Sequence, residues 1–114
     1  MTDSERKTAM KVIDNLLGAG FSLGVFDGEE ITVSRSTDGA AILEAMGTTD
    51  EDYIKVYPMG ATAKSKPPAM GWVRFVWGNE DWVAVCDYTT NLEPIMEGVQ
   101  AWTDEQERTC AASR

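Results

Sequence analysis

The sequence contains no histidine, and this absence excludes several kinds of catalytic site. A Ser-His-Asp triad, a Cys-His pair and a histidine-based metal site all need an imidazole as base or ligand. The nucleotide-binding patterns G-x-x-x-x-G-K-[ST] and strand-linked G-x-G-x-x-G are also missing. We therefore expect no cofactor and no enzyme of these classes.

Cysteine is scarce, with Cys86 and Cys110 as the two thiols of the chain. Two cysteines without histidine cannot complete a structural zinc site. Because Cys86 falls within a predicted strand and Cys110 within a predicted tail, we expect no disulfide framework. Cys86 is expected to be a small core residue, since mid-strand cysteines usually pack as hydrophobes.

Long apolar runs are absent, and the first seven residues are polar, so we expect neither a membrane span nor a secretory signal. The chain has 114 residues, of which 43% are hydrophobic. This length suits one domain, 1–114, with a core large enough to need no disulfide. The expected location is the cytoplasm.

Basic residues are few: ten lysines and arginines face nineteen acidic residues, giving a net charge of −9. Such a charge repels nucleic acid phosphates, so direct nucleic acid binding is not expected. It attracts basic protein surfaces, because complementary potentials steer association.

The remaining patterns predict an α+β fold with the element order α-β-β-α-β-β-β-α. Strands grouped in hairpins favour an antiparallel sheet of about five strands, with helices packed mainly on one face. The expected elements are a helix over 4–18, a hairpin within 21–34, a helix within 36–47, a strand over 53–57, a hairpin over 71–87 and a helix over 92–102, with a long loop over 59–70 and a frayed tail from about 104.

Local signals place the helix starts. Thr37 or Asp38 is the expected N-cap of the second helix. Asn91 is preferred over Thr90 as the N-cap of the last helix, because it places Pro94 where a missing N–H breaks no helical bond.

The first hairpin has two possible registers around Asp27-Gly28. A two-residue loop scatters the apolar side chains over both faces. A three-residue loop, with Gly28 in the left-handed region, aligns Leu23 with Ile31 and Phe21 with Val33. We prefer this bulged hairpin.

The hairpin over 71–87 is apolar on both faces, which a one-layer sheet does not need. A turn at Asn79-Glu80 pairs Val73 with Cys86, Phe75 with Ala84 and Trp77 with Trp82 on an uncharged face, which we assign to the core. The second face then carries six candidate partner-binding residues: Trp72, Arg74, Val76, Val83, Val85 and Asp87.

This second face has a functional and a structural interpretation. Trp and Arg often anchor protein interfaces, which favours binding of a protein partner or of a second copy as a homodimer. Alternatively, Arg74 pairs with Asp87 and lies over Trp72, while the loop over 59–70 covers the valines.

Acidic residues form two further candidate sites. Asp27, Glu29 and Glu30 surround the first turn, and Asp50, Glu51 and Asp52 precede the third strand. Together they predict an acidic patch, and an alternative function follows: a nucleic-acid mimic that occupies the basic groove of a host defence protein. A small enzyme with a carboxylate pair is a second alternative. No acidic cluster has the spacing of an EF-hand loop, so no metal site is expected.

Finally, the segments FDGEE (26–30), STD with AILEA (36–45), TTDED (48–52) and DYTTNLE (87–93) resemble small uncharacterised α+β proteins carried by proteobacterial phages, prophages and related mobile elements. The resemblance implies a factor that acts by binding and modulating a host protein, and it transfers no catalytic residues.

Overall fold

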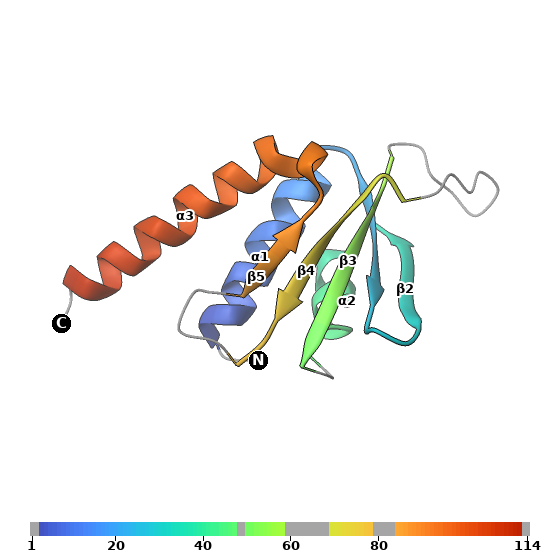
Figure 1. Cartoon of the computed structure of the whole chain (residues 1–114), viewed down its shortest axis with the longest axis horizontal. Coiled ribbons are helices and arrows are strands. Elements are labelled where there is room, and N and C mark those ends of the chain that lie inside the picture. The colour runs from blue at the N-terminus through green and yellow to red at the C-terminus, as the bar shows by residue number, and fades with distance from the viewer. Residues whose placement is uncertain (1–2, 48–49, 59–68, 79–83, 113–114) are drawn as a thin grey trace.

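The computed structural model describes residues 3–47, 50–58, 69–78 and 84–112. They form three α-helices, five strands and a short 3-10 helix in the predicted order, which confirms the α+β class (Figure 1). The elements are α1 (Asp3–Gly18), β1 (Ser22–Phe26), β2 (Ile31–Ser36), α2 (Gly39–Glu44), β3 (Glu51–Tyr57), β4 (Gly71–Val76), β5 (Val85–Tyr88), η1 (Thr90–Leu92) and α3 (Glu93–Ala112).

The strands form one antiparallel sheet in the order β2-β1-β3-β4-β5. Consequently β2 and β3 run in the same direction on either side of β1, and α2 connects them across the sheet. The helices lie on one face of the sheet, which we call the core face (Figure 1). No helix of the described part lies over the opposite face, which we call the outer face.

Alternation along the strands builds the core. The core face carries Leu23, Val25, Ile54, Val56, Val73 and Phe75, none of which is exposed to solvent. Helix α1 covers them with Ala9, Val12, Ile13 and Leu16, whose spacing places them on one helical stripe. Ile42, Leu43 and Met46 of the α2 segment and Leu92, Met96 and Val99 of the C-terminal segment also belong to the core.

The N-cap prediction for α2 is confirmed at Asp38, whose carboxylate accepts the N–H of Ala41 at 3.3 Å. The prediction for the last helix is wrong. Thr89 precedes the combined η1–α3 helix, and the Asn91 amide donates to the Met70 carbonyl at 2.9 Å instead. The helix also continues to Ala112, beyond the expected end at Trp102, so no frayed tail begins at 104.

The register predicted for the first hairpin is also wrong. Leu23 pairs with Ser36, not with Ile31, and Ile31 is half exposed opposite Phe26. The reason is the loop. The Asp27 carboxylate accepts the N–H groups of Glu29 and Glu30, both at 2.9 Å, so the turn takes more residues than expected. Gly28 does have the expected positive φ, 102°.

In the hairpin of β4 and β5, Arg74 lies opposite Asp87 and Phe75 lies opposite Val85, with a register shift between the two pairs. The predicted pairs, Phe75 with Ala84 and Val73 with Cys86, are therefore wrong, since Val73 lies opposite Tyr88. Cys86 is the extra residue of a bulge, which changes the face on which the preceding side chain lies. Val85 packs against the core, and Cys86 is exposed instead of buried.

Within the described residues, no helix has both the length and the apolar character that crossing a lipid bilayer requires.

Candidate functional site

The outer face of the sheet brings together side chains from four strands. The backbone pairs Phe26 with Tyr53 and Tyr53 with Arg74, and it pairs Lys55 with Trp72 and Arg74 with Asp87. Paired residues of neighbouring strands point to the same face. The outer face therefore carries Phe26, Glu51, Tyr53, Lys55, Tyr57, Trp72, Arg74, Val76 and Asp87.

Three rings form a continuous row across this face. The ring centroids of Phe26 and Tyr53 are 5.9 Å apart, and those of Tyr53 and Trp72 are also 5.9 Å apart, at interplanar angles of 53° and 73°. Tilted and edge-to-face packing of this kind is the favourable geometry for aromatic pairs. All three residues are only partly buried, so the aromatic row is a surface feature and not core.

A glycine makes room beside this row. A Cβ on Gly24 would lie 2.9 Å from the Val33 carbonyl oxygen and 3.1 Å from the Tyr57 ring. Without that Cβ, the Tyr57 ring lies close to the backbone of β1 and is buried. Gly24 thus allows the Tyr57 ring to pack closely against the backbone of β1.

Two cations lie over the aromatic row. The Lys55 ammonium is 5.1 Å from the centre of the Phe26 ring, and the Arg74 guanidinium is 6.0 Å from that of Tyr53. Arg74 also donates through Nε and Nη2 to Glu51 Oε2, at 3.2 and 2.7 Å. This hydrogen-bonded carboxylate holds the pKa of Arg74 above its ordinary value.

The expected contacts of Arg74 with Asp87 and Trp72 are thus replaced by contacts with Glu51 and Tyr53. The carboxylate of Asp87 accepts the N–H of its neighbour Tyr88 at 2.8 Å.

The structure brings four of the six predicted partner-binding residues together on the outer face: Trp72, Arg74, Val76 and Asp87. Val85 lies on the core face, because the Cys86 bulge reverses the expected alternation. Val83 lies outside the described residues. Sequence reasoning missed Phe26, Tyr53 and Lys55 as site residues, although the alternation in EDYIKVY already places Tyr53 and Lys55 on one face.

A pocket of about 470 Å³ opens on this face beside Trp72. Its walls are the rings of the aromatic row, with Lys55, Met70, Gly71 and Thr89 around them. The Thr89 hydroxyl accepts the N–H of Trp72 at 3.2 Å, which fixes the strand end that carries the indole. We call this cavity the Trp72 pocket.

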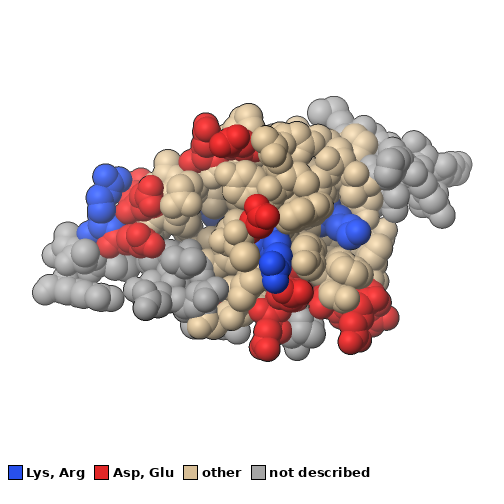
Figure 2. Space-filling view, in the orientation of Figure 1, with Lys and Arg blue, Asp and Glu red and all other residues tan. Residues whose placement is uncertain are grey.

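The two predicted acidic clusters meet at one end of the sheet. The turn after β1 carries Asp27, Glu29 and Glu30, and it adjoins Asp50 and Glu51 because β1 and β3 pair at Phe26 and Tyr53. Figure 2, which views the outer face, shows acidic side chains gathered at this lower end. The two backbone N–H groups bound by Asp27 lower the pKa of its carboxyl.

Asp52 does not belong to this patch, because its side chain lies on the core face and is fully buried. Its Oδ2 accepts the indole N–H of Trp77 at 2.7 Å and the backbone N–H of Gly47 at 2.8 Å. Burial raises the pKa of Asp52, and these two hydrogen bonds partly oppose that shift. A second buried acid missed by the sequence interpretation, Glu5 on α1, accepts the N–H of Gly78 at 2.8 Å.

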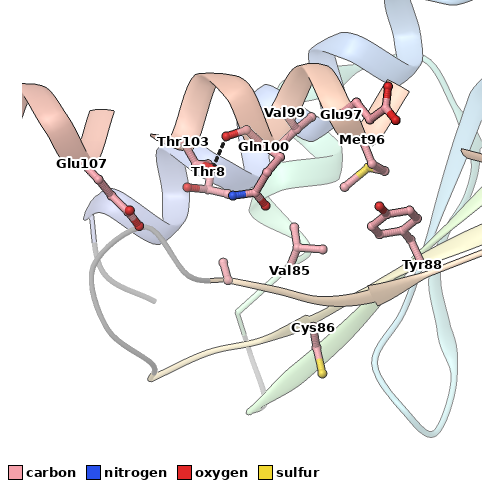
Figure 3. A pocket seen from close by; sticks show the side chains of 11 residues that line it. Thr8, Val85, Cys86, Tyr88, Met96, Glu97, Val99, Gln100, Thr103 and Glu107 are labelled. Carbon is pink, nitrogen blue, oxygen red and sulfur yellow. Dashed lines mark hydrogen bonds between the residues drawn. The ribbon is translucent and has the colours of Figure 1, made fainter. Parts of the chain in front are cut away.

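A second cavity, of about 340 Å³, lies between β5 and α3 (Figure 3). Val85, Tyr88 and Met96 face it, whereas the Cys86 side chain points to the other side of the sheet. Its two carboxylates, Glu97 and Glu107, are ten positions apart on α3, or about 15 Å along a helix. A glycosidase pair needs about 5–9.5 Å, so these two acids do not converge on a substrate.

Among the described residues, no three Cys, Asp or Glu side chains group closely enough to hold a metal ion. Comparisons with protein families, with curated proteins and with solved structures found no match to this chain. Function is therefore inferred from the geometry of the outer face.

Proposed function

We propose that the protein is a non-enzymatic interaction module that binds a protein partner through the outer face of its sheet. The observation that carries this proposal is the row of Phe26, Tyr53 and Trp72, which is partly exposed on a face that no described helix covers. Aromatic side chains and arginine supply most of the binding energy in protein interfaces.

The polar groups around the row support the same function. Arg74 is held in place by Glu51, and Lys55 lies over Phe26, so these side chains are ordered before a partner arrives. Preorganised side chains lose less conformational entropy on binding than free ones. The acidic residues at one end of the face favour one orientation of the partner, in which a basic region of the partner lies at that end.

Affinity capture from host lysate tests the proposal with three tagged proteins: the parent, Trp72→Ala and Glu97→Gln. Glu97 is an exposed residue of α3, away from the outer face, and serves as the matched control. We expect the parent and Glu97→Gln to recover the same partner and Trp72→Ala to lose it, with circular dichroism unchanged. Equal recovery by all three proteins would contradict the proposal.

A second candidate function is mimicry of nucleic acid, and the meeting of the two acidic clusters favours it. Here Asp27, Glu29, Glu30, Asp50 and Glu51 occupy the basic groove of a DNA- or RNA-binding host defence protein. Salt separates the two candidates, because ionic contacts weaken steeply between low and moderate ionic strength while apolar contacts persist. Capture at both ionic strengths therefore decides between them.

The proposal requires no catalytic residue, cofactor or metal. It includes the cytoplasm as the place of action and the phage or mobile-element setting that the sequence resemblance implies.

A further inference from the structure

The Trp72 pocket has walls of two chemical kinds, and they define what it can hold. Phe26, Tyr53 and Trp72 supply an apolar surface, and Lys55 supplies a positive charge at its edge. We propose that this pocket anchors the C-terminal residue of the protein partner, an aromatic or large apolar residue whose carboxylate pairs with Lys55. The inference rests on the proposed function and names the chemistry of its partner.

The size and lining of the pocket fit an apolar anchor. Its volume of about 470 Å³ exceeds that of a single phenylalanine or leucine side chain and falls within the usual range of ligand sites, about 300–1,000 Å³. The edge-to-face arrangement of Tyr53 and Trp72 leaves ring surface available to a further ring.

The positive charge of Lys55 favours an anionic group in the ligand. Within the described residues, Lys55 forms no ion pair, whereas Arg74 on the neighbouring strand is paired with Glu51. None of the described residues that line the pocket carries a carboxylate. The described site therefore offers no counter-charge to Lys55. A ligand with a carboxylate beside an apolar group complements both this charge and the aromatic walls.

A chain terminus fits this combination better than an internal acidic residue. In an extended segment, an internal Asp or Glu points away from the face of its immediate neighbour and shares a face only with residues two positions away, about 6.6 Å along the chain, so its carboxylate is not held directly beside an apolar group. A C-terminal residue carries its side chain and its carboxylate on the same Cα.

A terminus also fits better than a free organic acid. The pocket is open toward the outer face, so a small ligand would keep much of its surface in water. The residues that precede a terminus instead continue over the rest of the outer face and gain further contacts.

The test uses labelled protein and nuclear magnetic resonance titration. The probe is the acetylated peptide Ala-Ala-Ser-Ala-Phe with a free C-terminus, compared with the same peptide amidated, with a peptide ending in Ala and with phenylacetate. We expect saturable shifts at Lys55, Gly71 and Trp72 with the free Phe terminus, and at least tenfold weaker binding of the other three.

Two variants isolate the role of the charge. Lys55→Gln should bind the acid and the amide of the Phe peptide equally, at the weaker level, while keeping the parent's dispersed spectrum. Lys11→Gln, on α1 and outside the pocket, should bind as the parent does.

Three results would overturn the inference: equal affinity for the acid and the amide in the parent, an unchanged preference in Lys55→Gln, or phenylacetate binding as tightly as the peptide. If partner capture is lost in Trp72→Ala but unaffected by Lys55→Gln, the pocket inference fails and the proposed function stands. If neither substitution affects capture, the proposed function itself fails.

Discussion

Trp77 donates its indole N–H to Asp52 over 2.7 Å and thereby ties the end of β4 to the buried start of β3. Since the same carboxylate oxygen accepts the N–H of Gly47, one acid joins both strands to the segment that follows α2. A buried carboxylate in this position is both a structural link and an electrostatic cost.

We predict that Asp52→Ala lowers the free energy of unfolding by about 2–4 kcal/mol. The substitution removes the acceptor for two N–H groups, and each donor left without a partner in a buried site costs about 1–3 kcal/mol. Urea denaturation at neutral pH measures the loss. A decrease below about 1 kcal/mol would show that the two hydrogen bonds contribute little.

Asp52→Asn keeps an oxygen acceptor but cannot ionise, and it tests the raised pKa of this residue. The folded protein holds the Asp52 proton more tightly than the unfolded chain does, where the pKa is near 3.8. Ionisation therefore reduces stability as the pH rises from about 3.8 through the raised pKa. The stability of Asp52→Asn relative to the parent should increase over this window in urea titrations, and a difference independent of pH would contradict it.

Asp27 is expected to behave in the opposite way, because its pKa is lowered by the N–H groups of Glu30 and Glu29. Its contribution to stability is present above its ordinary pKa of 3.8 and is lost as the pH falls through the lowered value. Side-chain carbon resonances in a nuclear magnetic resonance titration should place the midpoint of Asp27 below 3.8. A midpoint at this ordinary value would argue against the turn geometry.

Substitutions on either side of the β5 bulge test the register of the last hairpin. Val85→Glu should reduce the free energy of unfolding by about 2–4 kcal/mol, because it places a charge on the face that packs against α3. Cys86→Ser is the matched control and should change it by less than about 0.5 kcal/mol, because Cys86 is exposed. Thermal and urea unfolding measure the stability of both variants. A larger loss for Cys86→Ser than for Val85→Glu would support the register expected from the sequence instead.

Gly24→Ala should destabilise the fold by about 1–3 kcal/mol, because its Cβ would collide with a backbone carbonyl and with the Tyr57 ring. Gly18→Ala provides the comparison. A Cβ there meets nothing within 4 Å, and alanine in the last turn of α1 should be neutral or stabilising. Thermal unfolding measures the effect. An unchanged melting temperature of Gly24→Ala would show that the close approach of Tyr57 to β1 does not contribute to stability.

The sequence was sufficient to predict the type and order of the helices and strands. For most strand residues it also predicted the face of the sheet on which the side chain lies, because both depend on local periodicity. Ile54 and Val56 alternate with Tyr53 and Lys55, and the structure places the two pairs on opposite faces. The register of both hairpins was not predictable in the same way. It depends on where an extra residue is accommodated, and the side chains of Val85, Cys86 and Asp87 did not indicate the bulge.

The candidate site was predicted in part. Trp72 and Arg74 were assigned to the correct face from their own hairpin, but their ring and charge partners come from β1 and β3. Contacts such as that of Arg74 with Glu51 depend on the strand order β1-β3-β4, which local patterns do not specify. Asp52 was assigned to an acidic surface because its neighbours are acidic, whereas strand alternation turns it into the core.

Both edges of the sheet are irregular. The ladder between β1 and β2 shifts register twice, and that between β4 and β5 shifts once. Bulges in these ladders twist the edge strands and make them poorer templates for an incoming strand. We therefore expect the backbone of the edge strands, together with the net charge of −9, to oppose growth of a shared sheet from molecule to molecule.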